Sequence, residues 1–305
     1  MVNERHEFEC LIGSIRKAYK PDWFVPKMNN SNIEFSKLWF VSFADSRYAY
    51  QLKRIHRQAL RFGFREDHIF TCTEDDLDKA FRLKMRDILV IGSRGYGYWC
   101  WKPQIILQAL EKMPKGDVLL YTDAGCYLNK KGMSRFSKYL EMAQEQGILG
   151  FQSRFGRNDV DENSIHKLLE KYWTKGDVFD WFGVREDSHI THTGQYWAGM
   201  MLVSKRTESV EFFKRFRQIF LDNLNLVTDQ PSVSPNFPGF IENRHDQSIF
   251  SLLYKINNYK SLSSAEAMPP WTKYNPANEV HVILGRDFFK HPENRPIYAL
   301  RNLST

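Results

Sequence analysis

Apolar residues recur along this chain in two alternating patterns, short continuous runs and spacings of three or four residues. Continuous runs bounded by turn formers predict buried strands, and spacings of three or four predict amphipathic helices. The predicted strands are residues 38–43, 68–71, 118–122, 148–152 and 198–203. The predicted helices are residues 48–62, 74–85, 104–113, 166–173, 208–221 and 245–256. The run at 87–91 is too short to assign to either state.

This alternation of strands and helices is typical of an α/β domain with a mostly parallel sheet. No linker, internal repeat or low-complexity tract interrupts the chain after residue 37, so we expect residues 37–305 to form one domain. Residues 1–36 mix charges, prolines and asparagines. That composition predicts an irregular leader, helical in part, before the domain.

The overall composition is that of a globular protein, with 42% hydrophobic and 15% aromatic residues among 305. No apolar run is long enough to span a bilayer, and the first residues lack the apolar core of a signal peptide. Four cysteines (Cys10, Cys72, Cys100 and Cys126) have neither disulfide-framework nor zinc spacing. We therefore expect a cytoplasmic protein with reduced thiols.

The formal net charge of +7 favours anionic partners, namely nucleic acid, acidic lipids or phosphorylated small molecules. The cations are spread along the chain and match no RNA- or DNA-binding motif, so we expect no nucleic-acid partner. Lys214, Arg215 and Arg217 give one predicted helix a basic face. That face is either simply solvated or a peripheral contact with the inner face of a membrane.

Asp123 directly follows the predicted strand 118–122, and Gly125 comes two residues later. Open α/β sheets bind ligands at the carboxyl ends of their strands, which makes Asp123 a candidate ligand-binding residue. The alternative is an aspartate that only caps the next turn. The residues of this segment do not decide between the two.

The block 94–103 contains two glycines, four aromatic residues and two cations, Arg94 and Lys102. Two fixed cations suit a diphosphate, and Tyr98, Trp99 and Trp101 offer flat faces to a base or sugar. A dinucleotide-binding fingerprint fails, because Cys100 stands where its third glycine belongs. The competing interpretation is that the tryptophans only pack a core.

Together, the block 94–103 and the segment Tyr121-Thr122-Asp123-Ala124-Gly125 resemble GT-A glycosyltransferases, in particular bacterial transferases of cell-surface polysaccharides. The resemblance covers about residues 37–260 and implies a GT-A, Rossmann-like fold and a nucleotide-sugar donor. That family commonly holds Mn²⁺ or Mg²⁺ with Asp-x-Asp. This chain has Gly125 in place of the second carboxylate, which puts metal dependence in doubt.

The resemblance also implies roles for residues elsewhere in the chain. Nucleotide or diphosphate binding falls to seven residues: Asp45, Tyr48, Arg94, Tyr98, Lys102, Tyr121 and Asp123. Sugar or acceptor binding falls to Gln195, Trp197, Gly199 and His245, and a metal would be held by Asp123 and His281. Asp45 could equally cap the helix that follows it, and a lone histidine such as His281 is more often a polar surface residue.

Asp246 opens the predicted helix 245–256, where a first-turn charge could simply stabilise the helix. The resemblance instead implies the carboxylate at the reacting centre. In an inverting enzyme it would be the general base, and in a retaining enzyme it would orient or stabilise the donor sugar. We expect a glycosyltransferase that moves a hexose, from a UDP-linked donor, to an oligosaccharide or lipid-linked acceptor. A nucleotidyltransferase and a basic nucleic-acid-binding protein are the alternatives.

Overall fold

The computed structural model describes residues 33–153, 169–267, 272–275, 280–283 and 295–299. Contacts divide the chain between residues 32 and 33, and the fold described is that of the second unit. The predicted leader 1–36 therefore lies almost wholly outside the described residues.

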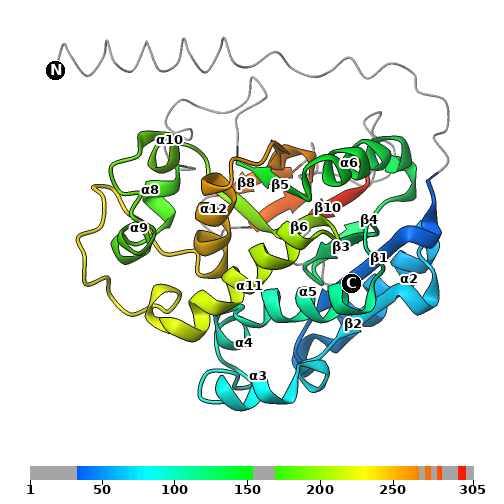
Figure 1. Cartoon of the computed structure of the whole chain (residues 1–305), viewed down its shortest axis with the longest axis horizontal. Helices are drawn as coiled ribbons and strands as arrows, with labels where there is room; N and C mark the ends of the chain where they lie inside the picture. Colours follow the sequence, from blue (N-terminus) through cyan, green and yellow to red (C-terminus); the bar gives the residue numbers. More distant parts are fainter. Residues whose placement is uncertain (1–32, 154–168, 268–271, 276–279, 284–294, 300–305) are drawn as a thin grey trace, which may run out of the picture. The chain divides into compact units, whose positions relative to one another are not determined.

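The main sheet has six strands in the order β2-β1-β3-β6-β5-β7 (Figure 1). Its strands are β1 (Leu38–Phe43), β2 (Ile69–Cys72), β3 (Val118–Thr122), β5 (Ile148–Gln152), β6 (Tyr196–Ser204) and β7 (Ser261–Ser263). Only β6 runs against its neighbours, β3 and β5, and the other pairs are parallel. The predicted α/β fold with a mostly parallel sheet is confirmed.

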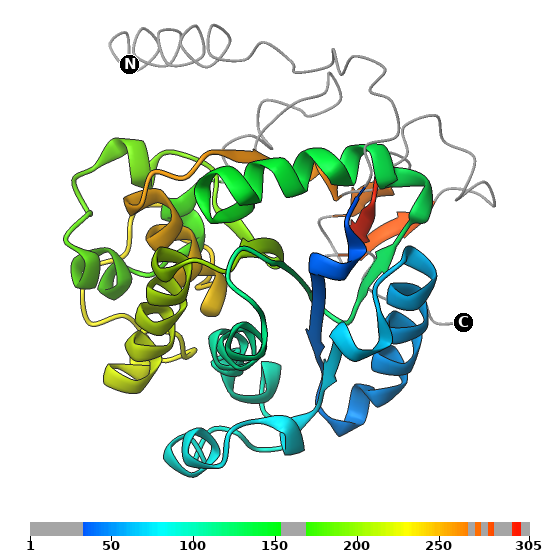
Figure 2. The same ribbon diagram turned by 45° about the vertical axis from the view of Figure 1, so that its right-hand side comes forward.

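Alternate residues of β1 and β3 enter two different cores, which is why both strands are continuous apolar runs. Trp39 and Leu119 face one core with helices α5 (Trp101–Lys112), α11 (Thr207–Asp222) and α12 (Asp246–Ile256). Phe40 and Leu120 face the other core with helices α2 (Ala49–Phe62) and α6 (Met133–Gln146). Figure 2 shows α2, in blue, and α5, in teal, on either side of β1.

The predicted helices α2, α5, α11 and α12 and strands β1, β3 and β5 are confirmed to within a few residues. Pro103 lies in the first turn of α5, where its missing N–H is tolerated. The stretch 74–85 is not one helix, because a capping box of Thr73 with Asp76 begins a short 3-10 turn, Glu74–Asp76, which ends at the extended Leu77. Asp78 then caps a separate helix, α3 (Lys79–Lys84). Residues 87–91 are turn and irregular loop, neither strand nor helix.

Several elements escaped the sequence analysis. Helix α6 was missed, as were the short helices α4 (Gly95–Tyr98), α9 (Gly176–Phe182) and α10 (Ser188–Thr191). Of the helix predicted at 166–173, the described part is α8 (Glu170–Trp173). Strand β4 (Cys126–Leu128) pairs antiparallel with β10 (Ile297–Ala299), and β8 (Thr272–Asn275) with β9 (Val280–Ile283). Among the described helices, none has the length and apolar character needed to cross a membrane.

Candidate functional site

Asp123 lies at the carboxyl end of β3, in the turn that leads to β4. Its backbone N–H donates to Gly199 O (2.9 Å), and its carbonyl accepts from the N–H of Cys126 (2.9 Å). The Tyr121 hydroxyl donates to Asp123 Oδ1 at 2.6 Å. The Asp123 side chain remains 31% exposed. A carboxylate fixed in this way at the edge of the sheet can reach a ligand, as the sequence predicts.

Lys102, in the first turn of α5, turns its side chain inward, and only 3% of it is exposed. Its ammonium donates to Asp246 Oδ2 at 2.5 Å and to Ala198 O at 3.1 Å. Asp123 Oδ1 lies 3.6 Å from the same nitrogen. Lys102, Tyr121, Asp123 and Asp246 thus form one group, here called the Lys102 cluster, at the carboxyl end of β3.

Burial dominates the electrostatics of this cluster. Burial raises the pKa of Asp246 to about 6, and the Lys102 ammonium opposes that rise. Burial also works against the charge of Lys102, but Asp123 and Asp246 hold its pKa above the usual value. Burial and the Asp123 carboxylate raise the pKa of the Tyr121 hydroxyl. The cluster therefore pairs a permanent cation with a carboxylate that titrates near neutral pH, which suits proton transfer.

The block 94–103 has an unusual backbone that brings its aromatic residues together. Gly95, Tyr96, Gly97, Tyr98 and Trp99 all have positive φ, between 50° and 84°. A Cβ on Gly95 would lie 2.4 Å from the Trp99 indole, so this turn requires glycine. Trp101 is buried and stacks on Phe43 at 4.0 Å, so the core-packing interpretation is correct for Trp101.

Arg94 and Lys102 differ in the contacts open to them. The Arg94 guanidinium is 47% exposed and pairs with Asp229 at 2.9 Å and with Glu242 at 3.7 Å. Lys102 is enclosed by the carboxylates of its own cluster. The two cations therefore do not form one open clamp, and only Arg94 can reach a diphosphate from the surface.

His245 is buried directly before Asp246 and has φ 56° and ψ −121°, a conformation strained for a residue with a side chain. Burial lowers its pKa, so the ring is neutral, and its Nδ1–H donates to Val227 O at 2.6 Å. Nε2 then has a free lone pair, and among the described residues it has no hydrogen-bond partner. The ring lies 5.5 Å from Trp99 and 5.3 Å from Tyr98, centre to centre.

Asp45 and Tyr48 follow β1, next to β3 in the sheet. Asp45 caps the turn Ser46–Tyr48 by accepting from the N–H of Arg47, and it also binds the Arg47 guanidinium at 2.7 Å. The capping interpretation is therefore correct for Asp45. Tyr48 is 51% exposed, and the Arg47 guanidinium lies 5.5 Å from the centre of its ring, so contact of the ring with a nucleoside remains a prediction.

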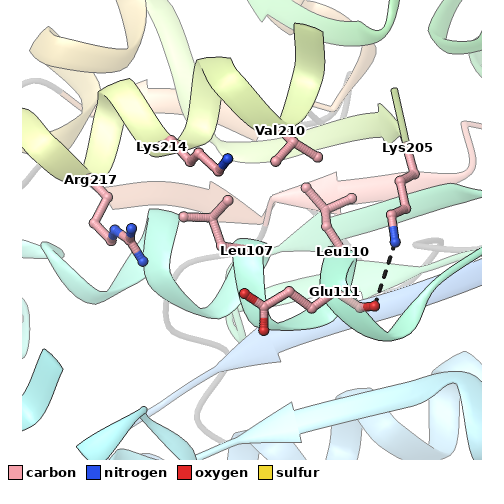
Figure 3. Close-up of a pocket in the computed structure, with 7 residues that line it drawn as sticks. All are labelled: Leu107, Leu110, Glu111, Lys205, Val210, Lys214 and Arg217. Carbon is pink, nitrogen blue, oxygen red and sulfur yellow. Dashed lines mark hydrogen bonds between the residues drawn. The ribbon is translucent and has the colours of Figure 1, made fainter. Parts of the chain in front are cut away.

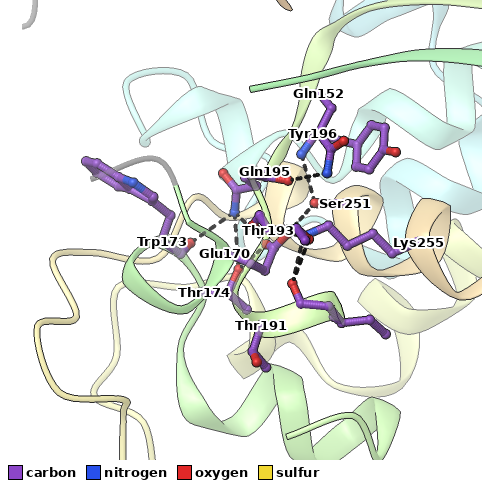
Figure 4. A network of polar contacts seen from close by, with 12 residues as sticks. Gln152, Glu170, Trp173, Thr174, Thr191, Thr193, Gln195, Tyr196, Ser251 and Lys255 are labelled. Carbon is purple, nitrogen blue, oxygen red and sulfur yellow. Dashed lines mark hydrogen bonds and ion pairs between the residues drawn. The ribbon is translucent and has the colours of Figure 1, made fainter. Parts of the chain in front are cut away.

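Gln195 belongs to a buried polar network with Glu170, Thr174 and Lys255 (Figure 4). Its Nε2 donates to Glu170 Oε1 at 3.0 Å, and Glu170 pairs with Lys255 at 2.7 Å. Gln247 donates to Gln195 Oε1 at 2.6 Å and accepts from the N–H of Ala198. Because the Ala198 carbonyl also binds Lys102, the network joins α8, β6 and α12 to the cluster.

Two further predicted site residues, Trp197 and Gly199, lie together on β6. A Cβ on Gly199 would lie 2.3 Å from the Trp197 indole, and Gly199 O accepts from the N–H of Asp123. Trp197 packs against the α2/α6 core. Gly199 is therefore needed for close packing beside Asp123, whereas sugar binding by either residue remains a prediction.

The divalent cation implied by the resemblance does not fit the described donors. Asp123 and Asp246 already face the Lys102 ammonium, and no three described His, Cys, Asp or Glu side chains converge. His281 lies in β9 opposite Tyr274, and its side chain is outside what the structure describes. Mg²⁺ and Mn²⁺ prefer sites rich in oxygen ligands, and here a fixed positive charge lies between the two carboxylates.

Arg54, on α2, was missed by the sequence analysis and holds the turn that carries Asp123. Its guanidinium donates to Ala124 O and, at 2.8 Å, to Cys126 O. It also stacks 3.9 Å over the ring of Tyr127 and binds Gln58 at 3.1 Å. A helical arginine carries no sequence signal for such contacts, because the carbonyls come from a segment 70 residues away.

A cavity of about 360 Å³ lies away from the Lys102 cluster, between α5 and α11 (Figure 3). Leu107, Leu110 and Val210 line it together with Glu111 and three cations. Those cations bind their own neighbours: Lys205 binds Met113 O, Lys214 binds Glu211, and Arg217 binds Gln104. None of the residues that line this cavity belongs to the Lys102 cluster, so we do not assign the cavity to the candidate site.

Comparison with known proteins finds solved structures that are similar to this chain. A glycosyltransferase involved in glycosylation of the major capsid of PBCV-1 has 11% identity and a TM-score of 0.40, over 77% of this chain and 83% of its own. Mouse xyloside xylosyltransferase 1 has 11% identity and a TM-score of 0.40, over 86% and 97%. The galactosyltransferase LgtC has 12% identity and a TM-score of 0.37, over 78% and 76%. No family model and no curated protein matches the chain.

Proposed function

We propose that this protein is a glycosyltransferase that uses a nucleotide-sugar donor. The observation that carries the proposal is the Lys102 cluster at the carboxyl end of β3. There a buried Asp246, whose pKa is raised to about 6, lies 2.5 Å from a fixed ammonium. Open α/β sheets bind nucleotides at this edge, and the motifs around the cluster resemble those of GT-A enzymes.

In this proposal Asp246 is the carboxylate at the reacting centre. A pKa near 6 leaves it ionised at neutral pH yet basic enough to take a proton from an acceptor hydroxyl. Asp123, with its partly exposed side chain, orients the donor at the end of β3. Tyr121 fixes the orientation of Asp123 through the 2.6 Å hydrogen bond.

The donor lies across the carboxyl ends of β1 and β3. The exposure of the Tyr48 side chain supports contact with the base, and the half-exposed Arg94 supports contact with the diphosphate. We propose a UDP-linked hexose as donor and an oligosaccharide or lipid-linked acceptor. The net charge of +7 agrees with an anionic donor and with peripheral contact at an acidic membrane in the cytoplasm.

The test is turnover of a panel of nucleotide sugars by the full-length protein, read as release of nucleoside diphosphate. We expect hydrolysis or transfer with one donor class, abolished in Asp123→Ala. A matched control is Asp67→Ala, which removes an exposed surface carboxylate paired with Arg65. Near wild-type turnover in Asp123→Ala, or no turnover with any donor and acceptor, would refute the proposal.

A further inference from the structure

We infer that the Lys102 ammonium takes the position of a divalent cation in this site, so that the transfer reaction needs no metal ion. This inference rests on the proposed glycosyltransferase function. It is carried by three contacts of one nitrogen, those with Asp246 Oδ2, Ala198 O and Asp123 Oδ1.

The first argument concerns donors and acceptors. An ammonium has three N–H donors, and Lys102 has three oxygens around it, at 2.5, 3.1 and 3.6 Å. Two of these oxygens are carboxylate oxygens from Asp123 and Asp246, which lie 123 residues apart in the chain. The oxygens that would bind a metal are therefore already arranged around a protein cation.

The second argument concerns charge. A divalent ion placed between the two carboxylates would meet the Lys102 charge at short range, where Lys102 and Asp246 are both shielded from water. It could enter only if the ammonium left its partners. Since just 3% of the Lys102 side chain is exposed, the displaced charge would remain buried without a carboxylate, which is strongly unfavourable.

The third argument concerns what the sequence omits. Gly125 stands where the resembled motif has its second carboxylate, so the turn offers Asp123 alone. A fixed ammonium beside Asp123 restores the positive charge that the missing metal would supply. Positive charge near a departing diphosphate stabilises its developing negative charge. The enclosed Lys102 ammonium acts through space, and Arg94 is the cation that can contact the diphosphate from the surface.

The experiment measures Mn²⁺ binding by electron paramagnetic resonance, on the full chain, with and without saturating UDP. We expect the wild-type protein to bind no stoichiometric Mn²⁺ beyond what UDP alone binds. In Lys102→Met the two carboxylates lose their shared cation while the side chain keeps its length, so Mn²⁺ binding should tighten by tenfold or more. Adding Asp123→Asn to Lys102→Met should abolish that gain.

The control is Lys115→Met, which removes an exposed lysine just after the same helix and should leave Mn²⁺ binding unchanged. One Mn²⁺ per wild-type chain, lost in Asp123→Asn, would overturn the inference. So would a Lys102→Met protein that is folded by circular dichroism and binds no more Mn²⁺ than the wild type.

A second measurement separates this inference from the proposed function. We expect turnover of the active nucleotide sugar to survive removal of metal by EDTA within about twofold. A loss of more than tenfold that Mn²⁺ restores would overturn metal independence and leave the glycosyltransferase proposal standing. If no nucleotide sugar reacts, the proposed function fails, and the Mn²⁺ titration still tests the role of Lys102.

Discussion

The ammonium of Lys102 lies 2.5 Å from Asp246 Oδ2, although 144 residues separate the two in the chain. Each residue lies in the first turn of its helix, α5 for Lys102 and α12 for Asp246. Both helices pack on the same core, so the sheet brings their first turns together at the end of β3. A buried lysine and a buried aspartate that satisfy each other in this way set the chemistry that the site can perform.

Asp246→Asn should lower turnover by about 100-fold or more, because an amide cannot accept the proton that a general base removes. Donor affinity should stay within about twofold. Turnover and donor binding are measured on the same folded protein.

The control for that variant is Asp222→Asn, at the exposed end of α11. It should change neither turnover nor stability by a measurable amount. If Asp246→Asn keeps normal turnover, Asp246 has no catalytic role. If turnover and donor affinity fall in proportion, Asp246 instead holds the sugar.

The pH dependence of turnover should show an acid limb with an apparent pKa near 6, the value to which burial raises Asp246. Below that pH the carboxyl is protonated and cannot act as a base, so kcat rises with pH and then levels. A profile measured from pH 4.5 to 8 checks this. An apparent pKa below 4.5, in the range of an ordinary aspartate, would contradict this assignment.

The ionisation of Asp246 that raises turnover with pH should lower the free energy of unfolding over the same pH range. The folded pKa of Asp246, about 6, exceeds the ordinary value of 3.8, so between these pH values the folded state binds more protons than the unfolded state. The contribution of Asp246 to the free energy of unfolding therefore falls as pH rises through this window. Urea unfolding at pH 4.5 and 7 should show a larger loss of stability with rising pH in the wild type than in Asp246→Asn.

Arg54→Ala should loosen the turn that carries Asp123, because two carbonyls, those of Ala124 and Cys126, lose their shared donor. We expect turnover to fall by about 10- to 100-fold through misplacement of Asp123. The buried Cys126 thiol should react at least tenfold faster with iodoacetamide, measured by mass spectrometry of its peptide. The equally buried Cys100 should react as in the wild type.

Arg57→Ala is the matched control, since Arg57 lies on the exposed side of the same helix and its guanidinium donates to Lys53 O at 3.2 Å. It should leave turnover and both thiols unchanged. An Arg54→Ala protein with wild-type turnover and a protected Cys126 would show that the contact is not needed to place Asp123.

Arg94→Ala should weaken binding of the nucleoside diphosphate by more than tenfold, about 1.4 kcal/mol, because Arg94 is the exposed cation of its block. Isothermal titration calorimetry measures this. Arg65→Ala, which breaks an exposed pair with Asp67, is the control and should not change the affinity. Equal affinities in wild type and Arg94→Ala would remove Arg94 from the diphosphate site.

Glu170→Gln should lower the free energy of unfolding by about 3–5 kcal/mol, because it leaves the buried ammonium of Lys255 without a countercharge. Urea unfolding gives this value. The control, Glu145→Gln, breaks an exposed pair with Lys260 and should cost less than about 1 kcal/mol. Similar losses in the two variants would mean that the network around Gln195 does not hold α8 against α12.

Local patterns in the sequence determined the strands and most of the large helices. β1 and β3 are mostly apolar, apart from Ser42 and Thr122, because both of their faces are buried. The helix α2 places Leu52, Ile55, Ala59 and Phe62 on one buried side. These predictions depend only on the side-chain repeats of a strand and of a helix, which are visible among residues close together in the sequence. Helix α6 showed the same spacing, at Phe136, Tyr139, Leu140 and Ala143, and was overlooked rather than hidden.

The position of Asp123 at the end of a buried strand was also readable from the sequence, because a strand's end fixes its edge of the sheet. The partners of the Asp123 carboxylate could not be predicted from the sequence. Lys102 reads as an open cation beside Arg94, and only the packing of α5 and α12 on one core turns it inward to Asp246. Arg54 likewise gains its role from the contact of α2 with β4. Such partners come from segments 70 to 144 residues apart, and chain periodicity carries no information about contacts over that distance.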